Sequence, residues 1–246
     1  MAQDAMQAKT PRIIPVLDVM GGQAVRAIGG RRELYAPVRS LLTDSTEPIA
    51  VARALLAAAG VNELYVADID ALQGHRPRLG WVKELTDAGC QVMVDSGFKS
   101  AADAIPVAAV GASVVVGTET LARFEELQAL VHSWDPERVV LSVDLRNGSV
   151  LGAESVWGRA TDVASVVERG IAIGMRRFLV LELARVGTGI GPGTVELCET
   201  VRRRFPEIEL LAGGGVRNRN DVSALGAAGV DGVLVASALH DGLISV

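Results

Sequence analysis

Short apolar runs alternate with longer amphipathic stretches along the whole chain of 246 residues. Eight of the runs have the length and the Val, Leu and Ile content of buried strands. These predicted strands cover residues 12–19, 63–68, 91–95, 113–117, 138–145, 177–182, 209–212 and 232–235. Apolar residues recur at helical spacing in the stretches between them, near residues 48–59, 77–89, 100–110, 121–132, 161–173, 193–204, 218–228 and 237–242.

Helix boundary signals agree with this division. Pro48 follows Thr46 and Glu47 at one predicted helix start, and Thr161-Asp162 precedes another, as is typical of a first helical turn. Eight strand–helix units in about 240 residues have the size and rhythm of a (β/α)8, or TIM, barrel. An open doubly wound sheet is the alternative, but no Gly-x-Gly-x-x-Gly follows the first predicted strand. The pattern therefore favours a TIM barrel of the α/β class.

The two halves of the chain resemble each other. Residues 94–121 align with residues 212–239 without a gap. This alignment matches Gly97 with Gly215, Asp103 with Asp221, and Gly111 with Gly229. Outside it, Asp18 followed by Gly22 matches Asp144 followed by Gly148, and Asp68 matches Glu182. A repeat of half the chain predicts two half-barrels of four units each. We therefore expect one barrel domain over residues 12–246, preceded by a flexible tail at residues 1–11.

The composition fits a barrel built from small branched residues. Hydrophobic residues make up 49% of the chain and aromatic residues only 4%, with 27 glycines. This hydrophobic content supports a sizeable core and excludes a disordered chain. The scarcity of aromatic residues argues against an antiparallel sandwich.

Charge and cysteine content exclude several functions. The net charge of −5 lacks the basic surplus of a nucleic-acid binder. No apolar run is long enough to span a membrane, and the first ten residues lack the apolar stretch of a signal peptide. We therefore expect a cytoplasmic protein. Because Cys90 and Cys198 lie far apart and the chain has three histidines, no metal site is expected.

Acidic residues stand at the ends of five predicted strands, where the active sites of such barrels lie. They are Asp18, Asp68, Asp95, Asp144 and Glu182. The repeat places Asp18 and Asp144 at equivalent positions on the first and fifth strands, across the barrel mouth. Two facing carboxylates with separately adjusted pKa values suit general acid–base catalysis. The alternative is that each caps a loop amide or pairs with Arg26 or Arg146.

A phosphate site is predicted after the seventh and eighth strands, where barrels commonly bind phosphate. Gly213, Gly214 and Gly215 follow the seventh strand, and glycines let backbone amides approach an anion closely. Ala236-Ser237 ends the eighth. The counterparts in the first half are Gly97 and Gly117-Thr118, but Asp95 would oppose a phosphate there.

These residues resemble a known family. The segments IIPVLDVMGGQAVRAIGG, ELYVADIDALQG, SVDLRNG and LLAGGGVRNRNDV are similar, in this order, to the HisA/HisF barrels of histidine biosynthesis. That family comprises phosphoribosylformimino-AICAR-phosphate (ProFAR) isomerase and imidazole glycerol phosphate synthase, which are barrels of the ribulose-phosphate-binding type. The resemblance covers nearly all of the chain after residue 11.

The resemblance implies roles for individual residues. Asp18 corresponds to the general base and Asp144 to the general acid of an Amadori rearrangement that opens a ribose ring. The two implied phosphate-binding halves are Gly213, Gly214, Gly215, Ala236 and Ser237 on one side, and Gly97, Gly117 and Thr118 on the other. The implied or candidate substrate-binding residues are Arg26, Asp68, Trp157, Glu182 and His75.

Two departures from the family pattern concern the substrate. Leu181 and Val186 stand where the family has a threonine and an aspartate after the sixth strand. Aliphatic groups there remove polar contacts to a polyhydroxylated substrate. Together with Asp95 in the first-half phosphate loop and the arginines Arg31, Arg32 and Arg39, they make the chain resemble the divergent HisA/HisF-related proteins of methanogens and methylotrophs.

The leading hypothesis is an isomerase-like enzyme without a cofactor. It would act on a phosphorylated metabolite by aspartate acid–base catalysis, in tetrahydromethanopterin- or methanofuran-linked one-carbon metabolism. One alternative is a genuine ProFAR isomerase, and another is a non-catalytic barrel that binds a metabolite or a partner. A homo-oligomer and a glutaminase-like partner both stay open.

Overall fold

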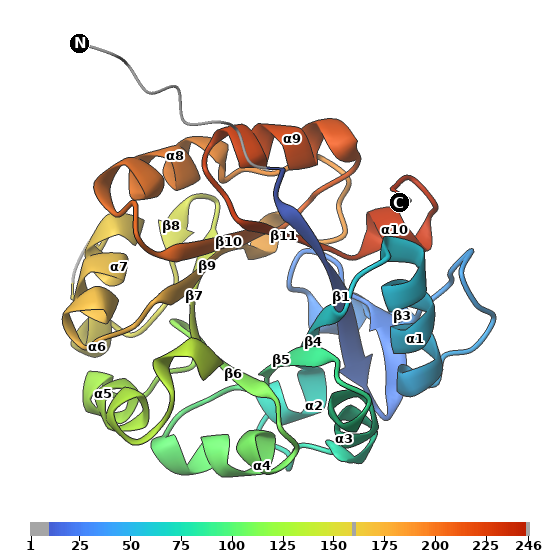
Figure 1. The fold of residues 1–246 in the computed structure, drawn as a ribbon, viewed down its shortest axis with the longest axis horizontal. Coiled ribbons are helices and arrows are strands. Elements are labelled where there is room, and N and C mark those ends of the chain that lie inside the picture. Colours follow the sequence, from blue (N-terminus) through green and yellow to red (C-terminus); the bar gives the residue numbers. More distant parts are fainter. Residues whose placement is uncertain (1–9, 159–160, 245–246) are drawn as a thin grey trace.

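The computed structural model describes residues 10–158 and 161–244. Within them, parallel strands form a closed barrel at the centre with helices around it (Figure 1). The barrel strands are β1 (Arg12–Met20), β4 (Glu63–Asp68), β5 (Gln91–Asp95), β6 (Ser113–Gly117), β7 (Val139–Arg146), β9 (Arg177–Glu182), β10 (Glu209–Gly213) and β11 (Gly232–Val235). They follow one another in chain order, and the barrel closes where β1 pairs with β11. The predicted TIM barrel is confirmed, and its strands match the eight apolar runs to within a residue or so.

The helices also follow the predicted pattern, with ends that differ by a few residues. They are α1 (Pro48–Ala59), α3 (Gly80–Asp87), α4 (Ala104–Ala109), α5 (Phe124–Ser133), α7 (Val163–Ala172), α8 (Val195–Arg204), α9 (Arg219–Ala227) and α10 (Ser237–His240). Elements that the pattern did not predict are β2 (Gln23–Arg26), β3 (Ala36–Pro37), β8 (Ser149–Val150), α2 (Ile69–Leu72) and α6 (Glu154–Trp157). These segments are too short to produce a recognisable hydrophobic period.

Alternation along each strand divides the core into two parts. Residues such as Ile14, Tyr65 and Met93 point into the barrel and form an inner cluster. Their neighbours in sequence, such as Leu17 and Val66, point outward and pack against the helices in a larger outer cluster. Because successive strand residues face opposite sides, the position of a residue along its strand decides whether it reaches the barrel interior.

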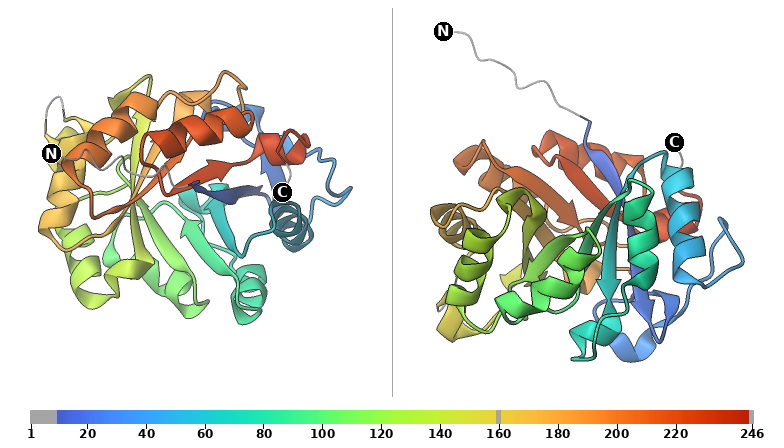
Figure 2. Two further views of the ribbon diagram at one scale, coloured as in Figure 1. Left: turned by 45° about the horizontal axis from the view of Figure 1, so that its top comes forward. Right: turned by 60° about the horizontal axis from the view of Figure 1, so that its bottom comes forward.

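Charged side chains occupy the amino end of the barrel interior. Arg177 is buried there and pairs with Glu209 and, at 3.7 Å, with Glu63. Arg12 pairs with the same two glutamates. The eight barrel strands all run in one direction (Figure 2), so their carboxyl ends gather at the opposite end. The space for a site therefore lies at that opposite end.

The two-fold repeat is visible in the local geometry. The tight turns at Gly21-Gly22 and Asn147-Gly148 all have positive φ and join hairpins at matched places in the two halves. Asp103 accepts the N–H of Lys99, and its counterpart Asp221 accepts the N–H of Arg217. The two halves are thus built alike at the level of individual hydrogen bonds.

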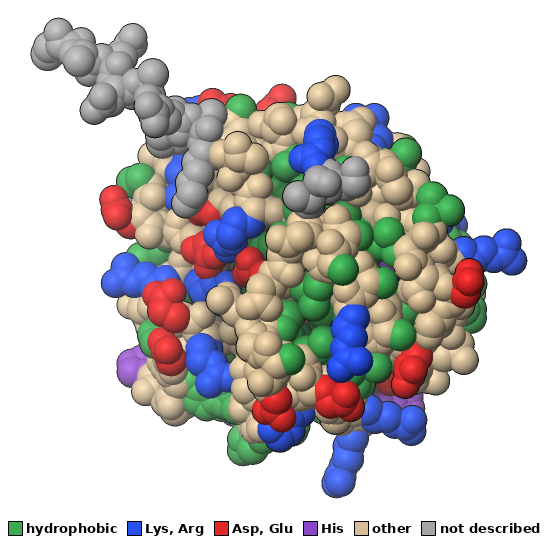
Figure 3. All heavy atoms as spheres, turned by 45° about the vertical axis from the view of Figure 1, so that its right-hand side comes forward, with side chains coloured by type: hydrophobic (Ala, Val, Ile, Leu, Met, Phe, Trp, Pro, Cys, Tyr) green, Lys and Arg blue, Asp and Glu red, His purple; other side chains and the backbone are tan. Residues whose placement is uncertain are grey.

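The surface carries both signs of charge. On the face drawn in Figure 3, acidic and basic side chains are interspersed among apolar ones. No helix in residues 10–158 or 161–244 has the length and hydrophobicity needed to cross a membrane. The tail expected at residues 1–11 falls mainly on residues 1–9, which lie outside the described residues.

Candidate active site

A cavity of about 950 Å³ opens at the carboxyl ends of the barrel strands. Its walls come from inward-facing strand ends, from the β2–β3 segment, and from the loops after β9, β10 and β11. Among the residues predicted from sequence, those that line the cavity are Asp18, Asp95, Asp144, Arg26, Leu181, Val186, Gly214, Gly215, Ala236 and Ser237. The structure thus brings together both predicted catalytic aspartates and most of one predicted phosphate site.

Asp18 faces the cavity from β1. Ile14, Val16 and Asp18 are alternate residues on the inner side of that strand. The Asp18 carboxylate has no hydrogen-bond partner among the residues that the structure describes. Burial, together with the charge of Asp95, raises the pKa of Asp18 to about 7. A carboxyl group with this pKa can both take and give a proton near neutral pH.

Asp144 faces the same cavity from β7, four strands away around the barrel and therefore opposite β1. Its Oδ1 accepts the hydroxyl of Ser142 at 2.6 Å, and its Oδ2 accepts the N–H of Glu119 at 3.4 Å. Burial, then the charge of Asp95, raises the pKa of Asp144 well above its ordinary value. The raised pKa favours the protonated form of Asp144, which is the form that can act as an acid.

Asp95 lies at the end of β5, between β1 and β7 in the order of the barrel strands. Its carboxylate accepts the hydroxyl of Tyr65 at 3.1 Å and the N–H of Gly97 at 3.2 Å. Burial raises the pKa of Asp95 to about 6, with these two hydrogen bonds acting in the opposite direction. Its negative charge in turn disfavours ionisation of Asp18 and Asp144.

The corner after β10 and β11 has the features of an anion site. A side chain at Gly214, where φ is +100°, would collide with the carbonyl oxygen of Glu182, and one at Gly215 would lie 2.6 Å from that of Gly191. Both positions therefore require glycine. The N–H groups of Gly214 and Gly215 have no acceptor among the described residues. These amides are thus available to an anion in the cavity.

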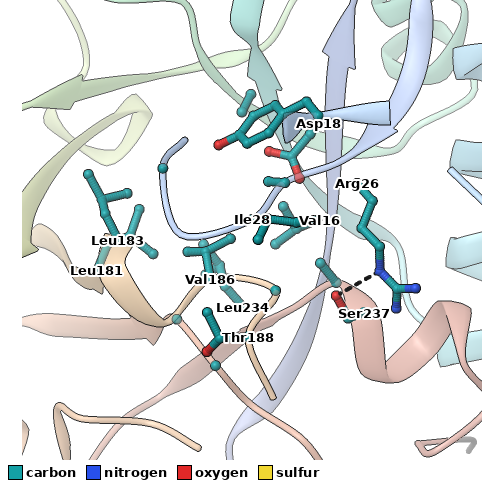
Figure 4. Close-up of a pocket in the computed structure, with 18 of the residues that line it drawn as sticks. Val16, Asp18, Arg26, Ile28, Leu181, Leu183, Val186, Thr188, Leu234 and Ser237 are labelled. Carbon is teal, nitrogen blue, oxygen red and sulfur yellow. Dashed lines mark hydrogen bonds between the residues drawn. The ribbon is translucent and has the colours of Figure 1, made fainter. Parts of the chain in front are cut away.

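Arg26 adds a cation to this corner, here called the β10–β11 corner (Gly214, Gly215, Ala236, Ser237 and Arg26). The Arg26 Nε donates to the Ser237 hydroxyl at 3.4 Å (Figure 4). Its Nη2 pairs with Asp241. Arg26 reaches this place from β2, which folds back on β1 through the turn at Gly21-Gly22. Gly213 does not line the cavity, and a Cβ at this position would lie 3.0 Å from side-chain atoms of Leu181 and Leu234.

The equivalent corner of the first half is organised differently. Gly97, Gly117 and Thr118 were predicted to bind phosphate, yet the structure places them behind the cavity wall. Thr118 is fully buried, and its hydroxyl accepts the N–H of Asp144 at 3.0 Å. A Cβ on Gly117 would lie 2.7 Å from Asp144 Oδ2. Here the glycines and the threonine make room for the aspartates and support them.

Apolar side chains form the wall between these polar groups. Leu181, Leu183 and Val186, from the end of β9 and the loop after it, lie on one side of the pocket, and Arg26 and Ser237 lie on the other (Figure 4). Ile28 and Leu234 extend the same surface. The two departures noted in the sequence, Leu181 and Val186, thus both face the cavity.

Two predicted substrate-binding residues point away from the cavity. Asp68 faces outward on β4, and its carboxylate caps α2 by accepting the N–H of Ala71 at 3.0 Å. Glu182 is buried on the outer side of β9, where it accepts the N–H groups of Asn147, Gly148 and Ala184. Ala67 and Leu181, which directly precede Asp68 and Glu182, face inward. Because side chains alternate along a strand, Asp68 and Glu182 face outward. Each carboxylate caps the short helical turn that directly follows its strand, in agreement with the two-fold repeat.

Trp157 and His75 also lie outside the cavity. The Trp157 indole is buried, donates to the carbonyl oxygen of Thr118 at 3.1 Å, and packs edge-on against Phe124. His75 is exposed, and its Nδ1 lies 3.0 Å from the carbonyl oxygen of Asp70. In this structure the positions of both residues correspond to structural or surface contacts.

Several cavity residues were not singled out from the sequence. Tyr65 is on the inner face of β4, Glu119 follows Thr118, and Tyr35 comes from the β2–β3 segment. Arg32, one of the arginines noted in the sequence, lines the cavity from the same segment. The alternation of β4 identifies Tyr65 as inward-facing, but no sequence signal fixes where the β2–β3 segment folds. No group of three or more His, Cys, Asp or Glu side chains within the described residues is arranged to hold a metal ion.

The sequence profile of a histidine biosynthesis protein family matches residues 12–245, which is nearly the whole barrel. The chain belongs to this family. Three relatives are named 1-(5-phosphoribosyl)-5-((5-phosphoribosylamino)methylideneamino) imidazole-4-carboxamide isomerase, that is, ProFAR isomerase. The protein of Deinococcus radiodurans is 31% identical, covering 97% of this chain and 98% of the relative. That of Klebsiella pneumoniae is 32% identical (95% and 96%), and that of Leuconostoc mesenteroides is 26% identical (95% and 96%).

The predicted HisA/HisF membership is confirmed, and the chain is an isomerase-like enzyme of that family. The relatives support the alternative of a genuine ProFAR isomerase better than a role in one-carbon metabolism, for which they give no support. The roles of the site residues, the oligomeric state, a glutaminase-like partner and the cytoplasmic location stay predictions.

Proposed function

We propose that this protein catalyses the aldose–ketose isomerisation named for its relatives, an Amadori rearrangement of an N-linked 5-phosphoribosyl compound. The observation that carries the proposal is the pair Asp18 and Asp144, which face one cavity from opposite strands with raised pKa values. The rearrangement needs one group that gives a proton and another that takes one.

Asp144 in its protonated form, which its raised pKa favours, would donate its proton to the ring oxygen of the ribose. The bond between C1 and that oxygen breaks, and the nitrogen lone pair forms a C1=N bond. Asp18 in its ionised form would then remove the proton from C2. The C2–H electrons form a C1=C2 bond and the C1=N electrons return to nitrogen. Transfer of a proton to C1, with loss of the proton from the C2 hydroxyl as its O–H electrons form the C2=O bond, yields the ketose, so that atoms and electrons balance without an oxidant or a reductant.

The β10–β11 corner would hold the 5-phosphate. The backbone N–H groups at Gly214 and Gly215, which have no acceptor among the described residues, would supply hydrogen bonds to phosphate oxygens. Arg26, which also pairs with Asp241, would supply positive charge. Anchoring the phosphate there leaves the ribose ring in the space between Asp18 and Asp144, where fixed orientation accelerates the proton transfers.

The test is direct assay of purified protein with the relatives' substrate, in wild type and in Asp18→Asn and Asp144→Asn. Each variant is expected to lose at least about a hundredfold in kcat, with an unchanged circular dichroism spectrum. Asp70→Asn is the matched control, because Asp70 lies outside the cavity and its carboxylate accepts the N–H of Gly21. Full activity in both cavity variants would refute these assignments.

A further inference from the structure

The two corners of the cavity mouth occupy matched positions in the repeat but differ in charge. The alignment of residues 94–121 with 212–239 pairs Asp95 with Gly213 and Glu119 with Ser237. The corner formed by Asp95, Gly97 and Glu119, here called the β5–β6 corner, therefore carries two carboxylates at positions where the second half of the chain has the hydrogen atom of Gly213 and the hydroxyl of Ser237. Both Asp95 and Glu119 line the cavity.

The backbone amides of the two corners are also used differently. Gly97 and Gly215 are matched and share the left-handed conformation, with φ of +71° and +83°. The N–H of Gly215 has no acceptor among the described residues, whereas the N–H of Gly97 donates to Asp95 at 3.2 Å. The N–H of Glu119 likewise donates to Asp144. The donors that could cradle a phosphate in the β5–β6 corner are therefore already bonded to carboxylates.

A phosphate entering the β5–β6 corner would also meet unfavourable charge. Asp95 and Glu119 face this part of the cavity, with Asp144 beside them. Arg32 offsets only part of this charge, since it lies 3.7 Å from Glu119 in an ion pair. Like charges at short range in a partly desolvated site repel. Geometry and charge thus both exclude a second phosphate from the β5–β6 corner.

The apolar wall indicates what can take the place of a second phosphoribosyl group. The name of the relatives' substrate contains two such groups. In this chain Leu181, Leu183 and Val186 offer a hydrocarbon surface, and they offer no hydrogen bond to sugar hydroxyls. Burying hydroxyls there without partners is unfavourable, whereas an apolar or aromatic ring gains from the contact.

We propose that the preferred substrate is a singly phosphorylated ribosylamine whose nitrogen carries an uncharged apolar or aromatic group. The phosphate lies in the β10–β11 corner, and the group on nitrogen lies against Leu181, Leu183 and Val186. This inference rests on the proposed isomerisation, because it names the substrate of that same site.

The test compares two substrates: the relatives' doubly phosphorylated compound, and the glycosylamine formed from ribose 5-phosphate and aniline. The acid-stable ketose product of each is quantified by chromatography. Wild type is expected to favour the aniline adduct by at least tenfold in kcat/KM. In Asp95→Asn and in Leu181→Thr the ratio should shift toward the doubly phosphorylated compound by at least fivefold, while Asp70→Asn should leave it unchanged.

Wild-type preference for the doubly phosphorylated compound, or a ratio that Asp95→Asn does not move, would overturn the substrate assignment alone. If folded protein converts neither compound, the proposed isomerisation is wrong, and the substrate assignment that rests on it is wrong as well. Calorimetric titration with inorganic phosphate gives a reading independent of turnover. We expect wild type to bind inorganic phosphate at one site per chain, and we expect Arg26→Ala to weaken this binding at least tenfold. Two equivalent phosphate sites in wild type would contradict the inference.

Discussion

Replacing Asp18 by asparagine is expected to stabilise the folded protein at neutral pH while it removes the proposed general base. The pKa of Asp18 is raised from its ordinary value of 3.8 to about 7, mainly by burial. Between these values the folded protein holds a proton that the unfolded chain releases. The stability that this proton contributes is complete below about pH 4 and is lost as the pH rises through about 7.

The magnitude follows from the size of the shift. About three pKa units at about 1.36 kcal/mol each give about 4 kcal/mol of lost stability above pH 7, of which about 2–3 kcal/mol is lost between pH 5 and pH 8. This value is a ceiling, because the carboxyl group faces an open cavity and water there moderates the penalty. Asparagine cannot ionise, so the Asp18→Asn protein does not suffer this loss.

Urea denaturation of wild type and Asp18→Asn at pH 5 and pH 8 measures the effect. The stability advantage of the variant should grow by up to about 2–3 kcal/mol between the two pH values. Asp87→Asn is the control: its carboxylate is exposed on α3 and pairs with Lys83 at 2.7 Å, so it should change stability by less than about 0.5 kcal/mol at both pH values. An advantage for Asp18→Asn that is the same at pH 5 and pH 8 would show that Asp18 ionises as it does in water.

Three further predictions test neighbouring parts of the site. Gly117→Ala places a Cβ 2.7 Å from Asp144 Oδ2, so kcat should fall at least about tenfold, and crowding of this buried carboxylate should also lower stability by about 1–3 kcal/mol; unchanged steady-state kinetics would contradict this. Arg26→Ala should raise KM about 10–100-fold with a smaller change in kcat, because a charged hydrogen bond to phosphate is worth about 1.5–3 kcal/mol; an equal fall in kcat at unchanged KM would argue against phosphate binding. Glu182→Gln disturbs a carboxylate that accepts three backbone N–H groups and should destabilise the protein by about 1–3 kcal/mol while kcat, measured well below the unfolding temperature, stays within twofold; a selective loss of kcat would restore Glu182 as a substrate-binding residue.

The barrel itself could be predicted because its strands are buried on both faces. The runs of β6 and β9 have Val, Leu and Phe at their centres, and they are bounded by glycine or charged residues that show where each strand ends. Short elements were missed for the opposite reason. The segment of α2 is four residues long, and four residues carry no measurable helical period.

The candidate site could be predicted only in part, because a strand end has two faces. Asp18 and Asp68 both close apolar strands in the sequence, yet only Asp18 is in phase with the inward-facing residues of its strand. Counting alternate positions back from each acid separates the two cases, so this signal was present in the sequence. The position of Trp157 had no such signal, because it depends on packing against Phe124 and on the carbonyl oxygen of Thr118.

The repeat duplicates backbone geometry, while single side chains decide what each copy does. Asp95 stands where the other half has Gly213, and this one difference has two consequences at once. It bonds the amide of Gly97, which removes a phosphate donor, and its charge raises the pKa values of Asp18 and Asp144. A second phosphate in the β5–β6 corner and a strong negative field from Asp95 are therefore mutually exclusive. Burial is the larger cause of both raised pKa values, and Asp95 adds to it. In this chain the proposed phosphate anchor is therefore the β10–β11 corner.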